Sequence, residues 1–213
     1  ILLSAAYRQS SQTADEAALV ADPDNRLLWR FNGRRVEGEA IRDSILKVAG
    51  RLNPERGGPP VFPPMPKGLD AIRLKGVDTW EGSSDAETRK RSLYVYQRRS
   101  LNYAFLETMD APVPTATCDR RRQSTTALQA LSLYNGDLVN EEARHFAARI
   151  RAESGPDPRE QIERAFLLAS GRAPNPKEKE RLLQFVKSAA SLQEGLTGLC
   201  RILFNSNEFV FVD

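Results

Sequence analysis

Histidine, cysteine and methionine are scarce in this sequence: its 213 residues include one histidine, two cysteines and two methionines. His145 has no second histidine with which to share a metal ion, and Cys118 and Cys200 lie far apart, without a Cys-x-x-Cys pair. These counts exclude a Cys/His zinc site and a c-type haem attachment motif, so we predict no metal and no cofactor in this chain. A disulfide between the two cysteines is left open, because their spacing does not establish how close they lie.

Long apolar runs are also missing. The most apolar stretch, from Gly198 to Val212, is interrupted by Arg201 and Glu208. A membrane-spanning helix needs about 20 consecutive apolar residues, so the sequence predicts no transmembrane segment. The chain begins with Ile1 and shows no signal peptide, and we expect it to be a fragment of a larger protein.

The net charge of +3 is small but unevenly distributed. Residues 89–122 contain eight Lys/Arg and three Asp/Glu, a local charge of +5, whereas the remainder contains 23 bases and 25 acids, a charge of −2. A local basic patch of this kind is typical of a surface that attracts an anionic partner.

The N-terminal half combines helical and irregular patterns. Residues 32–52 carry apolar side chains at helical spacing and predict an amphipathic helix. Before it, we expect a turn at Asp22 and a short helix that buries Leu28 and Trp29. Proline and glycine are frequent in residues 53–68 and the pattern stays weak up to residue 88, so 53–88 is predicted to be an irregular connection. Residues 91–100 alternate in a way that predicts a short strand, and residues 101–108 return to helical spacing.

The C-terminal part, residues 123–213, has the clearest helix signals. Cap residues are followed three positions later by Glu or Gln, the spacing of a capping box. These pairs are Thr126 with Gln129, Asp157 with Glu160, Asn175 with Glu178, and Ser191 with Glu194. We therefore predict a single, mainly α domain over 1–213 that contains a C-terminal helical bundle over 123–213. It should be a bundle of short antiparallel helices with long Pro/Gly-rich irregular connections and at most a small β-hairpin.

The stretch "APVPTATCDRRRQSTTALQALSLYN" places arginines and hydroxyls at the start of the helix that Thr126 caps. A helix N-terminus offers free N–H groups and partial positive charge, so an anion site is one interpretation. Its candidate residues are Arg120, Arg121, Arg122, Ser124 and Thr125. The favoured interpretation is a capped helix start in which at least one arginine is bound within the chain. Glu107, Asp110 and Asp119 are the nearest acidic acceptors in sequence.

Catalysis and nucleic-acid binding receive less support from the residues. A nucleophilic Ser or Cys needs an adjacent base, and His145, within "NEEARHFAARI", is interpreted as a residue on a helix face. The block "RKRSLYVYQRRSLNYAF" mixes bases with Tyr94, Tyr96, Tyr103 and Phe105, as single-strand binders do. The nearly neutral chain does not favour nucleic acid as a partner. Whether the chain is an enzyme stays open, with the balance toward no.

Seven blocks in order carry a resemblance over nearly the whole chain: "YRQSS", "DPDNRLLWRFNGRRVEGEAIRDSIL", "GGPPVFPP", "RRSLYVYQRRSL", "MDAPVPTATCDRRRQSTTALQALSLYN", "GRAPNPKEKERL" and "LCRILFNSNEFVFVD". Each quoted block occurs here without interruption, except that the first residue of the fourth is Lys90 in this sequence. Together the blocks resemble a planctomycete-specific C-terminal domain of unknown function. In that family the domain ends large secreted proteins that often begin with a cytochrome-c-like domain. Family members have a longer domain, so we expect exposed apolar side chains around Ile1, Leu2, Leu3 and Tyr7.

The resemblance implies an exported protein, in the periplasm, at the cell surface or secreted, with a haem on a different segment of the parent protein. Its partners would be the parent's other domains, and an anionic ligand or glycan is a further option. We expect a non-catalytic structural or interaction module. One alternative is an anion-binding or catalytic domain that uses the arginine-rich loop, as a polysaccharide hydrolase or a component of a haem-linked oxidoreductase. Single-stranded nucleic-acid binding is the second alternative.

Overall fold

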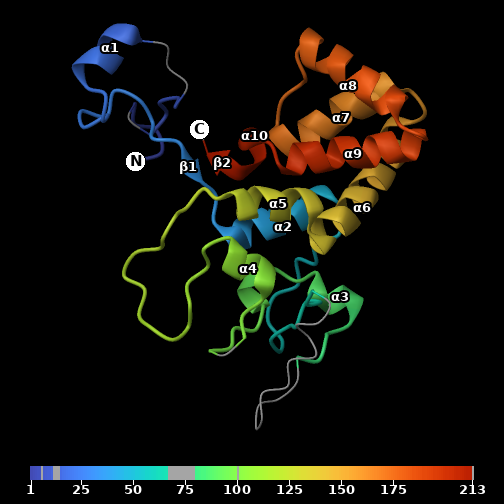
Figure 1. Ribbon diagram of the computed structural model, residues 1–213, viewed down its shortest axis with the longest axis horizontal. Coiled ribbons are helices and arrows are strands. Elements are labelled where there is room, and N and C mark those ends of the chain that lie inside the picture. The colour runs from blue at the N-terminus through green and yellow to red at the C-terminus, as the bar shows by residue number, and fades with distance from the viewer. Residues whose placement is uncertain (6, 12–14, 67–79, 100, 213) are drawn as a thin grey trace.

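The computed structural model describes residues 1–5, 7–11, 15–66, 80–99 and 101–212. Within these ranges the chain forms ten α-helices, one 3-10 helix and a two-stranded sheet, which confirms the mainly α prediction (Figure 1). The helices are α1 Glu16–Ala21, α2 Gly38–Val48, α3 Asp85–Thr88, α4 Ala104–Thr108, α5 Ala127–Asn135, α6 Asp137–Ser154, α7 Pro158–Ser170, α8 Pro176–Ser188, α9 Leu192–Phe204 and α10 Asn207–Val210. The strands are β1 Arg34–Arg35 and β2 Phe211–Val212. No helix in these ranges is both long and apolar enough to cross a bilayer.

Helices α5 to α10 form the C-terminal bundle, in which α9 is central. Figure 1 shows α7 and α8 on one side of α9 and α5 on the other, and α6 packs along it. The inward faces of α6 and α9 are fully buried, and the rings of Phe146 and Phe204 stack with centroids 5.6 Å apart. A Cβ added at Gly195 would lie 2.4 Å from the carbonyl oxygen of Val186, so α8 and α9 approach as closely as they do because this position is a glycine.

The helix starts lie at the predicted cap residues. Side chains of Thr126, Asp157, Asn175 and Ser191 each accept a backbone N–H of the helix that follows. The capping boxes of Thr126 and Asn175 are complete, since Gln129 and Glu178 reach back to the cap backbone. These short-range bonds satisfy donors that the first turn of a helix leaves open.

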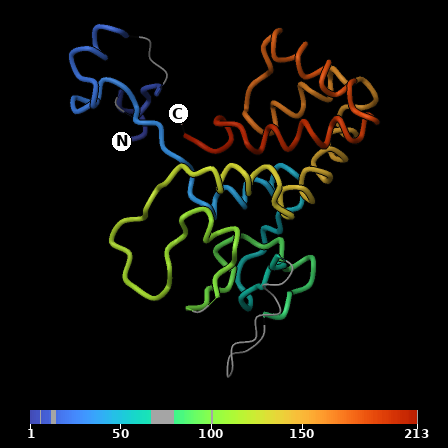
Figure 2. Tube along the Cα trace, in the orientation of Figure 1, coloured from blue at the N-terminus to red at the C-terminus, as the bar shows by residue number. Residues whose placement is uncertain are grey.

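Helix α2 is shorter than the predicted range of 32–52. Its first residue is Gly38, because residues 34 and 35 are extended and pair with the last strand. Arg34 is opposite Val212 and Arg35 is opposite Phe211 in an antiparallel ladder. The sheet is therefore no local hairpin: it joins two segments near opposite ends of the sequence, as the tube in Figure 2 also shows.

The prediction of a short helix that buries Leu28 and Trp29 is wrong. Residues 22–31 form turns rather than a helix, because the Asp22 carboxylate accepts the backbone N–H groups of Arg26 and Leu27. Leu28 is exposed and Trp29 is only partly buried; the helix of this region is α1, immediately upstream. Polar side chains that capture nearby backbone donors compete with helix formation in this way.

The segment 91–100 is not a strand over its described residues. Residues 92–94 form a 3-10 turn, because the N–H and hydroxyl of Ser92 both donate to Asp43 Oδ1 at 2.7 Å. Val95 forms only a single parallel bridge with Val61. Prolines flank Val61 closely on both sides and lack the N–H groups that would extend the ladder.

The described parts of the predicted connection, 53–66 and 80–88, are irregular apart from α3, and several of their side chains are packed. Val61 and Trp80 are buried in the core, and Trp80 Nε1 donates to the carbonyl of Pro63 at 2.7 Å. Phe62 packs edge-on against Trp80. The remainder of the predicted connection, residues 67–79, lies outside the described residues.

Candidate functional site

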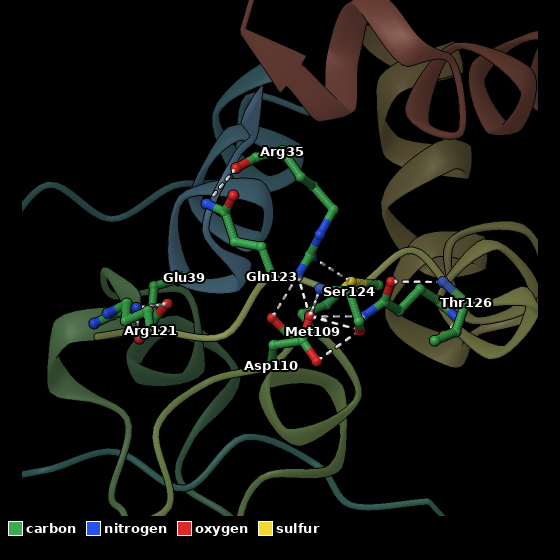
Figure 3. A network of polar contacts seen from close by, with 9 residues as sticks. Arg35, Glu39, Met109, Asp110, Arg121, Gln123, Ser124 and Thr126 are labelled. Atoms are coloured by element: carbon green, nitrogen blue, oxygen red, sulfur yellow. Dashed lines mark hydrogen bonds and ion pairs between the residues drawn. The ribbon is translucent and has the colours of Figure 1, made fainter. Parts of the chain in front are cut away.

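The loop between α4 and α5 is organised around the carboxylate of Asp110 (Figure 3). Arg35 Nη2 donates to this carboxylate at 2.5 Å, the backbone N–H of Ser124 at 2.8 Å and the Ser124 hydroxyl at 2.9 Å. Gln129 Nε2 adds a fourth donor at 3.0 Å. The donors come from β1, the loop and α5, so one acidic side chain ties β1, 75 positions away, to the loop and to the helix that follows it.

The backbone of Asp110 is left-handed, with φ of 62°. Asp and Asn tolerate this conformation better than most side chains, although it still costs energy relative to glycine. Burial alone would raise the pKa of Asp110, but the hydrogen bonds from Ser124 and Gln129 and the charge of Arg35 together lower that pKa below its ordinary value. Asp110 is therefore held as a carboxylate with its acceptor positions directed at the chain itself.

Gln129 connects this carboxylate to the start of α5. Its Oε1 accepts the backbone N–H of Thr126 at 3.1 Å, which completes the capping box. Its Nε2 donates to Asp110 and to the Ser124 hydroxyl. The capping residues predicted from sequence thus also belong to a longer polar network.

Arg35 is the buried cation of the network and has only 6% of its side chain exposed. Besides Asp110, it contacts the carbonyl oxygen of Met109 at 3.2 Å and the Met109 sulfur at 3.6 Å. Met109 in turn packs on Gly38, where an added Cβ would lie 2.6 Å from the Met109 Cβ. Sequence reasoning missed Arg35, because its partner lies 75 positions away and nothing local marks the pair.

The three consecutive arginines do not converge on one point. Arg121 Nη1 donates to both Glu39 carboxylate oxygens, at 3.0 and 2.9 Å (Figure 3). The same nitrogen lies 3.3 Å from Glu37 Oε2. The hydrogen bond that Arg121 donates to the Glu39 carboxylate raises the pKa of Arg121. Arg120 and Arg122 are exposed and form no ion pair within the described parts of the chain.

The predicted anion-site residues therefore divide into two groups. Ser124 and Arg121 are bound by the chain's own carboxylates, whereas the side chains of Arg120, Arg122 and Thr125 have no carboxylate partner among the described residues. The expectation that one arginine of the loop is held internally is met by Arg121. The acceptor differs from those predicted, because Asp110 is occupied by Arg35 and the acceptor comes from α2.

A second polar cluster joins the end of α2 to α3 and α6. Arg51 pairs with Asp85 at 2.8 Å and with Glu141 at 3.0 Å, and its Nε lies 3.6 Å from Glu142 Oε1. Glu142 is 2% exposed, and its Oε2 has no hydrogen-bond partner among the described residues. Burial raises the pKa of Glu142 to about 7, against the opposing charge of Arg51.

The remaining candidate chemistry is dispersed. His145 lies on an exposed part of α6. Partial desolvation of its imidazole is the main cause that lowers its pKa, and the positive charge of Arg51 is the second. Cys118 is exposed and Cys200 is buried, and both are free thiols rather than a disulfide. The described residues contain no group of three or more metal-ligating side chains. Tyr103 and Phe105 are buried, so they are not available to stack on bases.

Comparison with known proteins gives a family. The family described as "PSD1: Protein of unknown function (DUF1553)" matches residues 1–186. No curated protein and no solved structure matches the chain. The match stops inside α8, yet α9 lies beyond it and contributes Leu196, Leu199 and Phe204 to the core, so residues 187–212 belong to the same folded unit. Because the match covers most of the sequence, this chain belongs to the PSD1 (DUF1553) family of unknown function.

Proposed function

We propose that this chain is a non-catalytic structural or interaction module of a larger, exported bacterial protein of planctomycete type, and that it binds other domains of that protein. The observation that carries the proposal is the exposure of apolar side chains between residues 1 and 28. The exposed side chains there are Ile1, Leu2, Leu3, Tyr7, Leu19, Val20, Leu27 and Leu28. Eight exposed apolar side chains within one stretch of 28 residues are more than the singly scattered ones of an ordinary surface, and such concentrations mark interaction sites.

The N-terminal segment has little attachment to the core described above. No residue of α1 is buried, and Figure 1 shows α1 standing apart from the helical bundle. Backbone contacts such as the bond from Phe31 N–H to the Ser10 carbonyl hold the segment to itself. A segment that is folded locally but leaves its apolar residues uncovered is suited to packing against a neighbouring domain.

The export and the location, in the periplasm, at the cell surface or outside the cell, rest on the resemblance to secreted planctomycete proteins. So does the haem, which would be bound by a different segment of the parent protein. This part of the proposal is tested by determining where the parent protein is located and which segment of it binds haem.

The anion-binding or hydrolytic alternative has less support from the geometry. Ser124 and Arg121 already satisfy Asp110 and Glu39, so an external anion would have to compete with two internal carboxylates. The observation in its favour is the exposure of Arg120 and Arg122 on the same loop.

Hydrogen–deuterium exchange on the isolated chain and on the parent protein tests the proposal. We expect amides in residues 15–31 to exchange about tenfold more slowly in the parent, because a neighbouring domain covers them. The bundle helix α9 provides the internal reference and should exchange alike in both. Equal exchange of residues 15–31 in the two proteins would contradict an interaction through this segment. Turnover of an anionic polysaccharide by the chain, abolished by Arg121→Ala, would contradict a non-catalytic role.

A further inference from the structure

A cavity of about 380 Å³ opens beside the face of α5 that carries Leu128 and Leu131, away from the face with the buried Gln129 and Leu133. Its walls come from residues 64–66, from α4, from α5 and from the first turns of α6. The volume lies near the lower end of the roughly 300–1,000 Å³ typical of ligand pockets, which suits one or two side chains of a partner.

Most of the cavity wall is apolar. Met65, Phe105 and Leu138 line it, together with Leu128 and Leu131 of α5. Leu128 is 62% exposed and Leu131 is 54% exposed; they lie one turn apart and so share one face of the helix. Helix α5 thus presents apolar side chains to solvent beside a cavity that they do not fill.

Among the described residues, the charged side chains that line the cavity are both acidic. Asp137 and Glu141 lie on α6, one turn apart, and no described lysine or arginine lines the cavity. Glu141 is half exposed and shares Arg51, whereas Asp137 is exposed and forms no ion pair within the described residues. An anionic ligand would meet these carboxylates, so a phosphate backbone or an anionic glycan does not fit this end of the cavity.

We propose that this cavity binds a peptide segment of a partner, which inserts a leucine- or phenylalanine-sized side chain and places a neighbouring lysine or arginine against Asp137 and Glu141. The inference rests on the proposed interaction function and specifies a second surface for it, distinct from residues 1–28. Ser132 and Asn135 also line the cavity and provide side-chain hydrogen-bonding groups for a peptide backbone. The apolar side chain supplies the affinity and the acidic end selects a basic neighbour.

Two fluorescein-labelled heptapeptides, GLFLKKG and GLFLEEG, titrated against the 213-residue chain and followed by fluorescence anisotropy, test this proposal. We expect saturable binding of the lysine peptide and about fivefold weaker binding of the glutamate peptide, since exposed charge pairs contribute up to about 1 kcal/mol. Leu131→Asp should weaken binding of the lysine peptide at least about tenfold. Leu167→Asp, at a similarly exposed leucine on α7 outside the cavity, is the matched control and should bind as the unaltered chain does.

Four results would overturn the proposal: no saturable binding of either peptide up to about 1 mM, equal binding of the two peptides, equal loss in Leu131→Asp and Leu167→Asp, or binding that appears only when residues 67–79 are replaced by a Gly/Ser linker of the same length. The last result would mean that residues 67–79 of the chain itself, rather than a partner, occupy the cavity. Exchange protection of residues 15–31 in the parent protein does not depend on Leu131, so the proposed function can hold while this inference fails.

Discussion

Removing the Asp110 side chain is expected to destabilise the fold more than removing the side chain of Arg120, Arg121 or Arg122. The Asp110→Ala variant leaves Arg35, 6% exposed, without its carboxylate, and it also removes the acceptor of the Ser124 N–H and of Gln129. Taking one partner from a buried ion pair typically costs about 3–5 kcal/mol, because the other charge stays buried and uncompensated. We expect a loss in this range in the free energy of unfolding.

The left-handed backbone of Asp110 separates two contributions to that loss. Asp110→Gly removes the same carboxylate but relieves the φ of 62°, which costs a side-chain-bearing residue about 1 kcal/mol or more. The glycine variant should therefore lose less than the alanine variant, by up to about 1 kcal/mol once the larger entropy of an unfolded glycine is subtracted.

Equilibrium unfolding in urea at pH 7.5, followed by circular dichroism, measures these differences. Asp119→Ala is the control. Asp119 is exposed, and within the described parts of the chain its carboxylate accepts only the neighbouring Arg120 N–H, so the loss in free energy of unfolding should stay within about 0.5 kcal/mol. A loss below about 1 kcal/mol in Asp110→Ala would refute the view that this carboxylate holds β1, the loop and α5 together.

Three further changes test other parts of the structure. The folded-state pKa of Glu142, about 7, lies above the ordinary 4.5, so this group favours folding at low pH and loses that contribution as pH rises through about 7. The free energy of unfolding of Glu142→Gln, relative to that of the unaltered chain, should therefore rise by about 1–3 kcal/mol from pH 5 to pH 8, as measured by urea unfolding at the two pH values. A difference that is the same at both pH values would contradict the raised pKa. Gly195→Ala should cost about 2 kcal/mol or more, because its Cβ meets the Val186 backbone, whereas Gly198→Ala meets only the edge of a half-exposed ring and should cost less; equal thermal midpoints would argue against the close helix crossing. Asn175→Ala should cost about 1 kcal/mol in thermal unfolding through loss of the α8 cap, and no change would place the start of α8 elsewhere.

The parts of the fold that were predictable from sequence are those in which a residue acts on its near neighbours. Asn175, with Pro176 and Glu178, marks a helix start by bonds that span three residues, and the structure contains all of them. The same locality explains the errors. Asp22 also acts on nearby groups, but it does so by accepting backbone N–H groups in a turn, which the apolar pattern of the surrounding residues does not reveal. Ser92 instead donates its N–H and its hydroxyl to Asp43, 49 positions away, and no local pattern marks that contact.

The candidate site could be predicted only in part, since its central contact is long-range. The sequence identified the hydroxyls and arginines of the loop and the cap at Thr126, all within one short segment. The partner of Asp110 is Arg35 and the partner of Arg121 is Glu39, both more than 70 positions away. Pairing between groups so distant depends on how α2 and β1 pack, and a single sequence carries no local signal for that.

The pairing of β1 with β2 makes the order of events in folding depend on synthesis of almost the entire chain. Residues 34–35 emerge early from the ribosome, but their strand partner at 211–212 emerges after every helix of the bundle. Closing so long a loop adds little entropy cost compared with a medium one, yet contacts of high sequence separation form slowly. The bundle helices can assemble while residues 1–36 are still undocked. Until residues 211–212 have been synthesised, β1 has no strand partner, and the exposed leucines of residues 1–28 stay accessible to chaperones during this period.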